Sequence, residues 1–251
     1  MGPREIYLRT RKRPDLVFNT YVARPPAAVV VALVAPTRVT PNQITLAALG
    51  VAAVAAALII GAPGYAGLLA AIVVYELSYV LDCADGMLAR LRGIASPSGH
   101  LLDFLMDELK AFIILGAVGV RLYREPGARW AFPPGSPWWL LLTVAGLVCL
   151  ASGIALTTFV RRPEIAGPPV AAPAAVAPAS RSPVRLALRA LERVAKLCIH
   201  YPSYILMVAL VGRLELYFFP YVAVNALYAL RALAQVALRF GRSDWAPRDG
   251  A

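Results

Sequence analysis

Two short stretches of sequence, eight residues apart, place acidic side chains in strongly apolar surroundings. They are DCADGMLAR at residues 82–90 and GHLLDFLMD at residues 99–107. Residues three or four positions apart lie on one face of a helix. Asp82 and Asp85 therefore share a helix face, and so do Asp103 and Asp107. Two antiparallel helices joined by a short turn would bring the four carboxylates together.

The composition around these stretches predicts a membrane protein. Hydrophobic residues make up 59% of the 251 residues and charged residues 16%, against about 45–50% and about 25% in soluble domains. The three cysteines are odd in number and far apart, which argues against a disulfide framework or a zinc site.

The net charge of +11 would suggest nucleic-acid binding in a soluble protein. In an apolar chain it indicates basic cytoplasmic loops, so we expect membrane lipids and no nucleic acid as partners.

A membrane-spanning helix needs about 20 mostly apolar residues, and six stretches meet this requirement. They are Gln43–Ala62, Tyr65–Leu91, Gly99–Val120, Trp138–Val160, Leu197–Val211 and Leu216–Leu238. The fifth is the shortest. The fold class expected is therefore an all-α polytopic membrane protein with six transmembrane helices.

The remaining segments complete the expected domain organisation. The apolar run Ala27–Ala35 is too short to span and predicts a short cytoplasmic helix lying along the membrane surface. It belongs to a cytoplasmic N-terminal segment, residues 1–41, which precedes the six-helix transmembrane domain, residues 42–240. Within that domain, residues 161–183 are rich in Pro and Ala, which predicts a flexible linker. Residues 241–251 form a cytoplasmic tail.

Basic residues are distributed unevenly about the predicted spans. With the N-terminus in the cytoplasm, 20 of the 25 Lys and Arg residues lie on the cytoplasmic side. The positive-inside rule therefore predicts that both termini and the carboxylate cluster face the cytoplasm, with the chain in the cell's inner membrane. Trp130, Trp138 and Trp139 would then form an aromatic belt at the outer interface.

Four aspartates in two adjacent spans need a common explanation. Inserting one aspartate at the centre of a spanning helix costs about 2.5–3.5 kcal/mol of free energy on insertion scales. A cluster of hard oxygen ligands suits Mg²⁺ or Mn²⁺. Two such ions commonly serve phosphoryl transfer, where they neutralise phosphate charge. Arg90 adds a fixed cation for a phosphate, and Gly86 leaves room for a ligand or a facing backbone. The pattern indicates a site for a diphosphate.

Carboxylates also cluster in membrane proteins for structural ion pairing, cation transport or prenyl transfer. Structural ion pairing would need more nearby cations than Arg90, Arg92 and Lys110. A non-enzymatic cation transporter would be expected to show inverted repeats, which the sequence lacks. An intramembrane prenyltransferase also binds Mg²⁺ through aspartates, but its Asn-Asp-x-x-Asp-x-x-x-Asp element is missing.

Every fixed position of the pattern D-x-x-D-G-x-x-A-R, eight residues, G-x-x-x-D-x-x-x-D is filled by residues 82–107. The chain thereby resembles the CDP-alcohol phosphatidyltransferases. Thr40-Pro41-Asn42, before the first span, resembles a second segment of that family. The resemblance implies that an acceptor alcohol attacks a phosphorus of a CDP-linked lipid, usually CDP-diacylglycerol, and releases CMP. It also implies a homodimer.

Site residues follow from the same resemblance. Asp82, Asp85, Asp103 and Asp107 would hold two divalent ions, Mg²⁺ or Mn²⁺, and Asp107 would also act as general base. The CDP-lipid site would be lined by Thr40, Pro41, Asn42, Gln43, Gly86, Arg90 and Ser96. The segments containing Thr40 and Ser96 also read as ordinary helix starts.

The acceptor alcohol is left open by the sequence. Arg193, Lys196 and His200 recur at helical spacing near the entrance of the fifth span. Such a basic stripe would suit an acceptor that carries phosphate, such as glycerol 3-phosphate or an inositol phosphate. The positive-inside rule and contact with anionic lipid headgroups account for the same stripe without an acceptor.

Overall fold

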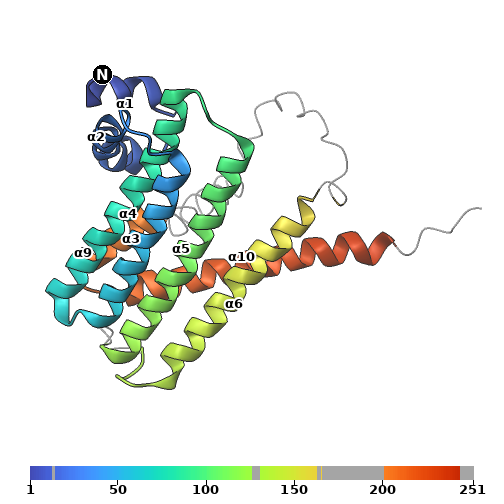
Figure 1. Ribbon diagram of the computed structural model, residues 1–251. Helices are drawn as coiled ribbons and strands as arrows, with labels where there is room; N and C mark the ends of the chain where they lie inside the picture. Colours follow the sequence, from blue (N-terminus) through green and yellow to red (C-terminus); the bar gives the residue numbers. More distant parts are fainter. Residues whose placement is uncertain (13–14, 126–130, 163–164, 166–200, 244–251) are drawn as a thin grey trace, which may run out of the picture.

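The computed structural model describes the chain except for residues 13–14, 126–130, 163–164, 166–200 and 244–251. Its described residues form helices and connecting turns with no strand, as the sequence predicts. Long helices pack side by side, and α10 runs across them (Figure 1). The elements are α1 Pro3–Thr10, a π-helical turn Asn19–Ala23, α2 Arg24–Val34, α3 Pro41–Gly61, α4 Gly64–Arg92, α5 Pro97–Arg124, α6 Pro137–Val160, α9 Tyr201–Val211 and α10 Glu215–Ser243.

Four helices are long and apolar enough to cross a membrane, namely α3, α4, α6 and the Glu215–Gly241 part of α10. Helix α5 has 28 residues but carries four charged side chains between Asp103 and Lys110. The described part of the fifth predicted span, α9, has only 11 residues. Length and apolarity therefore identify four of the six predicted spans.

Capping interactions fix where α3, α4 and α5 begin and end. At the start of α3, the Gln43 amide donates to Thr40 Oγ1 (3.3 Å) and the Thr40 amide donates to Gln43 Oε1 (2.9 Å), which is a capping box. Helix α5 begins likewise, with the Gly99 amide donating to Ser96 Oγ (3.1 Å). Helix α4 ends at Gly93, whose φ of 66° favours glycine. The turn between α4 and α5 is therefore short, as the sequence predicts.

Helices α1 and α2 lie across the end of the bundle where α4 finishes and α5 begins (Figure 1). Ile6 of α1 and Val31 of α2 are buried against Met87 and Leu88 of α4. The predicted Ala27–Ala35 helix thus corresponds to α2 and packs on the same end of α4 as the aspartates. Most of the predicted linker, residues 161–183, lies outside the described residues.

The opposite end of the bundle is closed by arginines. Arg121 of α5 is buried and donates to the carbonyls of Ile59 (2.9 Å), Ala62 (2.7 Å) and Gly64 (2.7 Å). Arg124 donates to the Ile60 carbonyl (2.8 Å). The last carbonyls of a helix have no partner within it and carry partial negative charge. These arginines therefore complete the C-terminal end of α3.

The predicted aromatic belt is wrong for Trp139. Its side chain is fully buried and packs against Phe132, Phe218 and Phe219, whereas Trp138 is 56% exposed. Consecutive residues on a helix point about 100° apart, so one tryptophan faces the core and its neighbour faces outward. Trp130 lies outside the described residues.

Candidate active site

Three of the four predicted aspartates meet between α4 and α5, which both pack against α3. One carboxylate oxygen from each of Asp82, Asp85 and Asp103 lies within 4.8 Å of the other two. Thr45 of α3 donates its hydroxyl hydrogen to Asp85 Oδ2. Asp103 Oδ1 is buried and has no hydrogen-bond partner within the described part of the chain. A buried carboxylate oxygen without a partner is unfavourable, and a hard divalent cation would satisfy it.

Asp107 lies one turn beyond Asp103 and is linked to the other aspartates through Lys110. The Lys110 ammonium donates to Asp107 Oδ1 (2.8 Å) and to Asp82 Oδ1. The side chain of Lys110 is 3% exposed, whereas that of Asp107 is 44% exposed. Lys110 therefore neutralises part of the cluster, as structural ion pairing would require. Asp85 and Asp103 form no ion pair with the residues that the structure describes.

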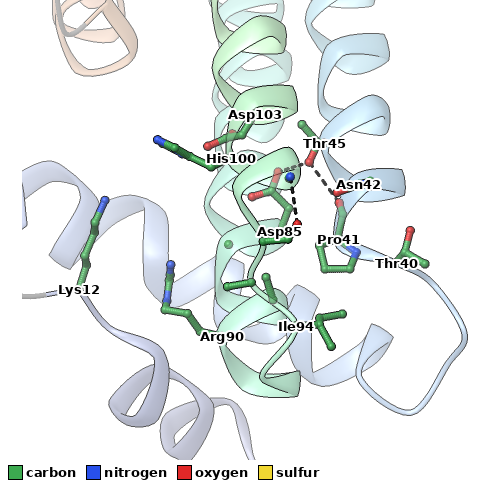
Figure 2. A pocket seen from close by; sticks show the side chains of 15 residues that line it. Lys12, Thr40, Pro41, Asn42, Thr45, Asp85, Arg90, Ile94, His100 and Asp103 are labelled. Atoms are coloured by element: carbon green, nitrogen blue, oxygen red, sulfur yellow. Dashed lines mark hydrogen bonds between the residues drawn. The ribbon is translucent and has the colours of Figure 1, made fainter. Parts of the chain in front are cut away.

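A cavity of about 390 Å³ opens beside the aspartates (Figure 2). Asp85 and Asp103 contribute to its wall. Six of the seven residues predicted to bind the CDP-lipid also line it: Thr40, Pro41, Asn42, Gly86, Arg90 and Ser96. The seventh, Gln43, closes the capping box with Thr40 and is not among the lining residues.

Two glycines allow close packing at this cavity. A Cβ atom on Gly86 would lie 3.2 Å from Arg90 Nη1, and one on Gly99 would lie 3.1 Å from Ser96 Oγ. Both distances are shorter than ordinary contacts of a Cβ atom. Gly86 therefore leaves room for the guanidinium of Arg90, and Gly99 leaves room for the hydroxyl that caps α5.

Three polar residues to which the sequence gives no role also line the cavity: Lys12, Thr45 and His100. Figure 2 shows Lys12, Arg90 and His100 on one side of the cavity and Thr40, Pro41 and Asn42 on the other. Thr45 lies four residues after Pro41, so helical spacing from the Thr-Pro-Asn segment could have identified it. Lys12 had no such signal, because its position depends on how α1 packs.

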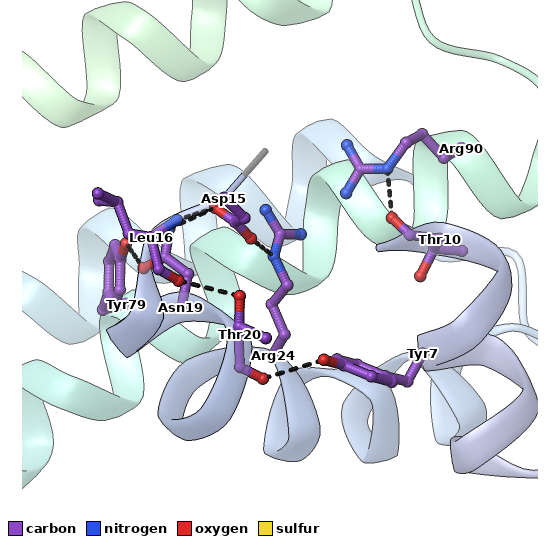
Figure 3. Close-up of polar contacts among 9 residues, drawn as sticks. All are labelled: Tyr7, Thr10, Asp15, Leu16, Asn19, Thr20, Arg24, Tyr79 and Arg90. Carbon is purple, nitrogen blue, oxygen red and sulfur yellow. Dashed lines mark hydrogen bonds and ion pairs between the residues drawn. The ribbon is translucent and has the colours of Figure 1, made fainter. Parts of the chain in front are cut away.

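The N-terminal segment is attached to α4 on both sides of the first aspartate pair (Figure 3). The Tyr79 hydroxyl donates to Asn19 Oδ1, and Arg90 Nε donates to the Thr10 carbonyl (2.8 Å). Tyr79 precedes Asp82 in α4, and Arg90 follows Asp85. The segment that carries Lys12 is therefore held against the cavity by contacts close to the aspartates.

Arg92, at the end of α4, holds the connection that leads into α3. Its guanidinium donates to four carbonyl oxygens in this connection: Val34 (3.3 Å), Ala35 (3.2 Å), Thr37 (2.9 Å) and Val39 (2.5 Å). These bonds hold the backbone that leads to Thr40 in place. Arg92 thus stabilises the connection that carries Thr40 to the cavity wall.

The predicted acceptor stripe of Arg193, Lys196 and His200 lies outside the described residues, so its position relative to the aspartates stays a prediction.

Comparisons with known proteins agree with the geometry of the site. Residues 38–211 match the CDP-alcohol phosphatidyltransferase family. A phosphatidylinositol phosphate synthase of Corynebacterium glutamicum is 30% identical over 156 residues, which cover 57% of this chain and 62% of the relative. The chain therefore covers less than two thirds of that protein.

The family match includes both aspartate stretches and the start of α3, and it decides against a prenyltransferase or a transporter. The chain belongs to the CDP-alcohol phosphatidyltransferase family, whose members are transferases of phospholipid synthesis.

Proposed function

We propose that this chain transfers a phosphatidyl group from CDP-diacylglycerol to the hydroxyl of a small alcohol and releases CMP. The observation that carries the proposal is the position of the aspartates. Three of their carboxylate oxygens lie within 4.8 Å of one another, and two of these aspartates line a cavity together with Arg90 and the start of α3. The cavity volume of about 390 Å³ falls within the range of roughly 300–1,000 Å³ that is usual for ligand pockets.

The residues present suit the two divalent ions, Mg²⁺ or Mn²⁺, that the resemblance implies. Asp82, Asp85, Asp103 and Asp107 would hold them, and the unpartnered Asp103 Oδ1 supports this assignment. Bound there, the ions would neutralise charge on the diphosphate of the donor.

Cations and small polar groups of the cavity bind the donor in this proposal. Arg90 and Lys12 pair with the diphosphate, because a guanidinium or an ammonium forms strong charge-assisted bonds with phosphate oxygens. Thr40, Pro41, Asn42, Gly86 and Ser96 form the wall against which the CDP moiety lies. Gln43 contributes by holding Thr40 in the capping box.

Asp107 is the proposed general base. Its side chain is 44% exposed and lies one helical turn beyond Asp103, which lines the cavity, so an acceptor at the edge of the cavity would meet it. Asp107 accepts the proton of the acceptor hydroxyl, whose oxygen forms a new bond to the phosphorus that carries diacylglycerol. The bond between this phosphorus and the bridging oxygen of CMP breaks, and its electron pair leaves on CMP.

The acceptor in this proposal carries a phosphate group of its own. The name of the Corynebacterium glutamicum relative makes an inositol phosphate the first acceptor to test, with glycerol 3-phosphate second. Arg193, Lys196 and His200 are the candidate residues for that phosphate.

We further propose that the enzyme is a homodimer in the inner membrane with its active site in the cytoplasm. In this arrangement α5 and the predicted span Leu197–Val211 complete six spans, and α2 lies along the membrane surface. The 20 of 25 basic residues on one side of the predicted spans support this orientation.

The test is to incubate the purified protein with labelled CDP-diacylglycerol, Mg²⁺ or Mn²⁺, and a panel of alcohols. CMP should be released only when both a metal ion and a suitable acceptor are present. Asp107→Asn should abolish release while the protein stays folded, and Glu108→Gln, at the neighbouring carboxylate, is the matched control. Failure to release CMP with any acceptor would contradict the proposal, and an active Asp107→Asn variant would remove Asp107 from the role of base.

A further inference from the structure

Within the described part of the chain, Lys110 is the cation in direct contact with two of the aspartates. The residue is 2% exposed, and its Nζ donates to Asp82 Oδ1 of α4 and to Asp107 Oδ1 of its own helix at 2.8 Å. Lys110 stands outside the fixed positions of the aspartate pattern. Lysine is rarely fully buried unless it is paired, so its position here reflects these two carboxylates.

The ammonium lies where negative charge is concentrated. Asp82 belongs both to the ion pair with Lys110 and to the group of three carboxylates within 4.8 Å. Carboxylates this close repel one another unless a cation lies among them. An ammonium is a compact point charge with three donors, so it can occupy carboxylate oxygens that a metal ion would otherwise bind.

We propose that Lys110 is a built-in counter-cation of the aspartate cluster, which stabilises the metal-free protein and competes with divalent metal for Asp82 and Asp107. The proposal rests on the metal site of the proposed function. It makes Lys110 a positioning residue, since it holds two carboxylates in place without touching the substrate. A bound metal ion displaces the ammonium from at least one of its two partners.

Removing the charge of Lys110 therefore has two linked consequences. The metal-free protein loses stability, because two carboxylates are left without their buried partner. Metal binding becomes tighter, because the ion no longer has to displace an ammonium and relieves more repulsion when it binds. Since a ligand that binds only the folded state raises its stability, metal should stabilise such a variant more than it stabilises the wild type.

The test compares full-length wild type, Lys110→Met and Lys110→Arg in detergent, with Mn²⁺ titrations followed by electron paramagnetic resonance. Methionine keeps much of the length of lysine without its charge, and arginine keeps the charge. Lys110→Met should bind Mn²⁺ at least tenfold more tightly than wild type, melt at a lower temperature without metal, and gain more in Tm from saturating Mn²⁺. Lys110→Arg should stay close to wild type. Unchanged or weaker binding by Lys110→Met would overturn the inference.

A second measurement uses the wild type alone, in case Lys110→Met does not fold. The chain has three lysines, Lys12, Lys110 and Lys196, so ¹³Cε-labelled lysine gives a simple NMR spectrum that Lys110→Arg assigns. Saturating Mg²⁺ should shift the Lys110 signal as the ammonium leaves a carboxylate. An unchanged Lys110 signal in a protein that binds Mg²⁺ would overturn this inference alone. No metal binding by any of the three proteins would overturn the proposed metal site as well.

Discussion

Thr45 of α3 donates its hydroxyl hydrogen to Asp85 of α4, a residue 40 positions later in the chain. Both residues are almost fully buried, at 3% and 5% exposed. The bond ties the start of α3, where Thr40 and Asn42 line the cavity, to the aspartate cluster. A contact of this kind orients a carboxylate before any ligand binds.

Thr45→Val should therefore weaken the site while preserving its shape. Valine has nearly the same volume as threonine but no hydroxyl, so Asp85 loses its partner. Loss of such a supporting hydrogen bond typically lowers metal affinity or activity by about 10–100-fold. Mn²⁺ affinity and CMP release would both be measured, with Thr45→Ser as the control that retains the hydroxyl. A Thr45→Val variant that matches wild type in both would show that the bond has no role in the site.

Lys12→Ala should raise the KM for the CDP-lipid roughly tenfold with a smaller effect on kcat, since a tenfold change corresponds to about 1.4 kcal/mol of binding. The reason is that Lys12 lines the cavity and can pair with the diphosphate of the donor. The control is Arg11→Ala, because Arg11 is also exposed and basic but is not among the residues that line the cavity. Equal effects of the two substitutions would indicate general attraction of anionic lipid.

Arg121→Met should reduce stability without changing the chemistry. Arg121 satisfies three backbone carbonyls at the far end of the bundle, and its loss leaves buried acceptors without donors. We expect a loss on the order of 3 kcal/mol, seen as a lower Tm in detergent. Arg124→Met, which removes a single bond to a carbonyl, should have a smaller effect. CMP release per folded molecule should stay near wild type, and a large drop would contradict a purely structural role.

The ion pair between Asp15 and Arg24 should make stability depend on pH in the acid range. Burial raises the pKa of Asp15, but the hydrogen bond and the charge of Arg24, with smaller contributions from Asn19 and Leu16, hold the pKa below its ordinary value. A lowered pKa in the folded state adds stability above the unfolded pKa of about 3.9, and this is lost as pH falls through the folded pKa. Asp15→Asn should remove this part of the dependence. Identical acid profiles of Tm for both proteins would contradict the assignment.

The positions of the helix ends, and the helix faces that carry the aspartates, can be predicted from the sequence because they depend on local rules. Helical spacing puts Asp82 and Asp85 on one helix face, and Thr40 and Ser96 are typical N-cap residues that predict helix starts. The predicted spans begin within two residues of α3, α4, α5 and α6. The residues of the CDP site follow from the family resemblance, and six of the seven residues predicted in this way line the cavity.

Contacts between elements distant in sequence could not be predicted in this way. The partner of Asp85 is Thr45, on another helix, and Lys12 reaches the cavity only because α1 packs on α4. The sequence places Lys110 within a predicted span, but its pairing with Asp82 depends on the relative register of α4 and α5. Spacing along one helix determines which residues share a face, whereas tertiary packing decides what that face meets.

The central claim is that the aspartate cluster joins a phosphatidyl group to an alcohol. The most direct test measures CMP and new phospholipid in the same reaction, with CDP-diacylglycerol, Mg²⁺ and the acceptor that supports turnover. The account predicts that wild type forms the two products in equal amounts and that folded Asp103→Asn forms neither. Formation of CMP without phospholipid, or undiminished formation of both by Asp103→Asn, would contradict it.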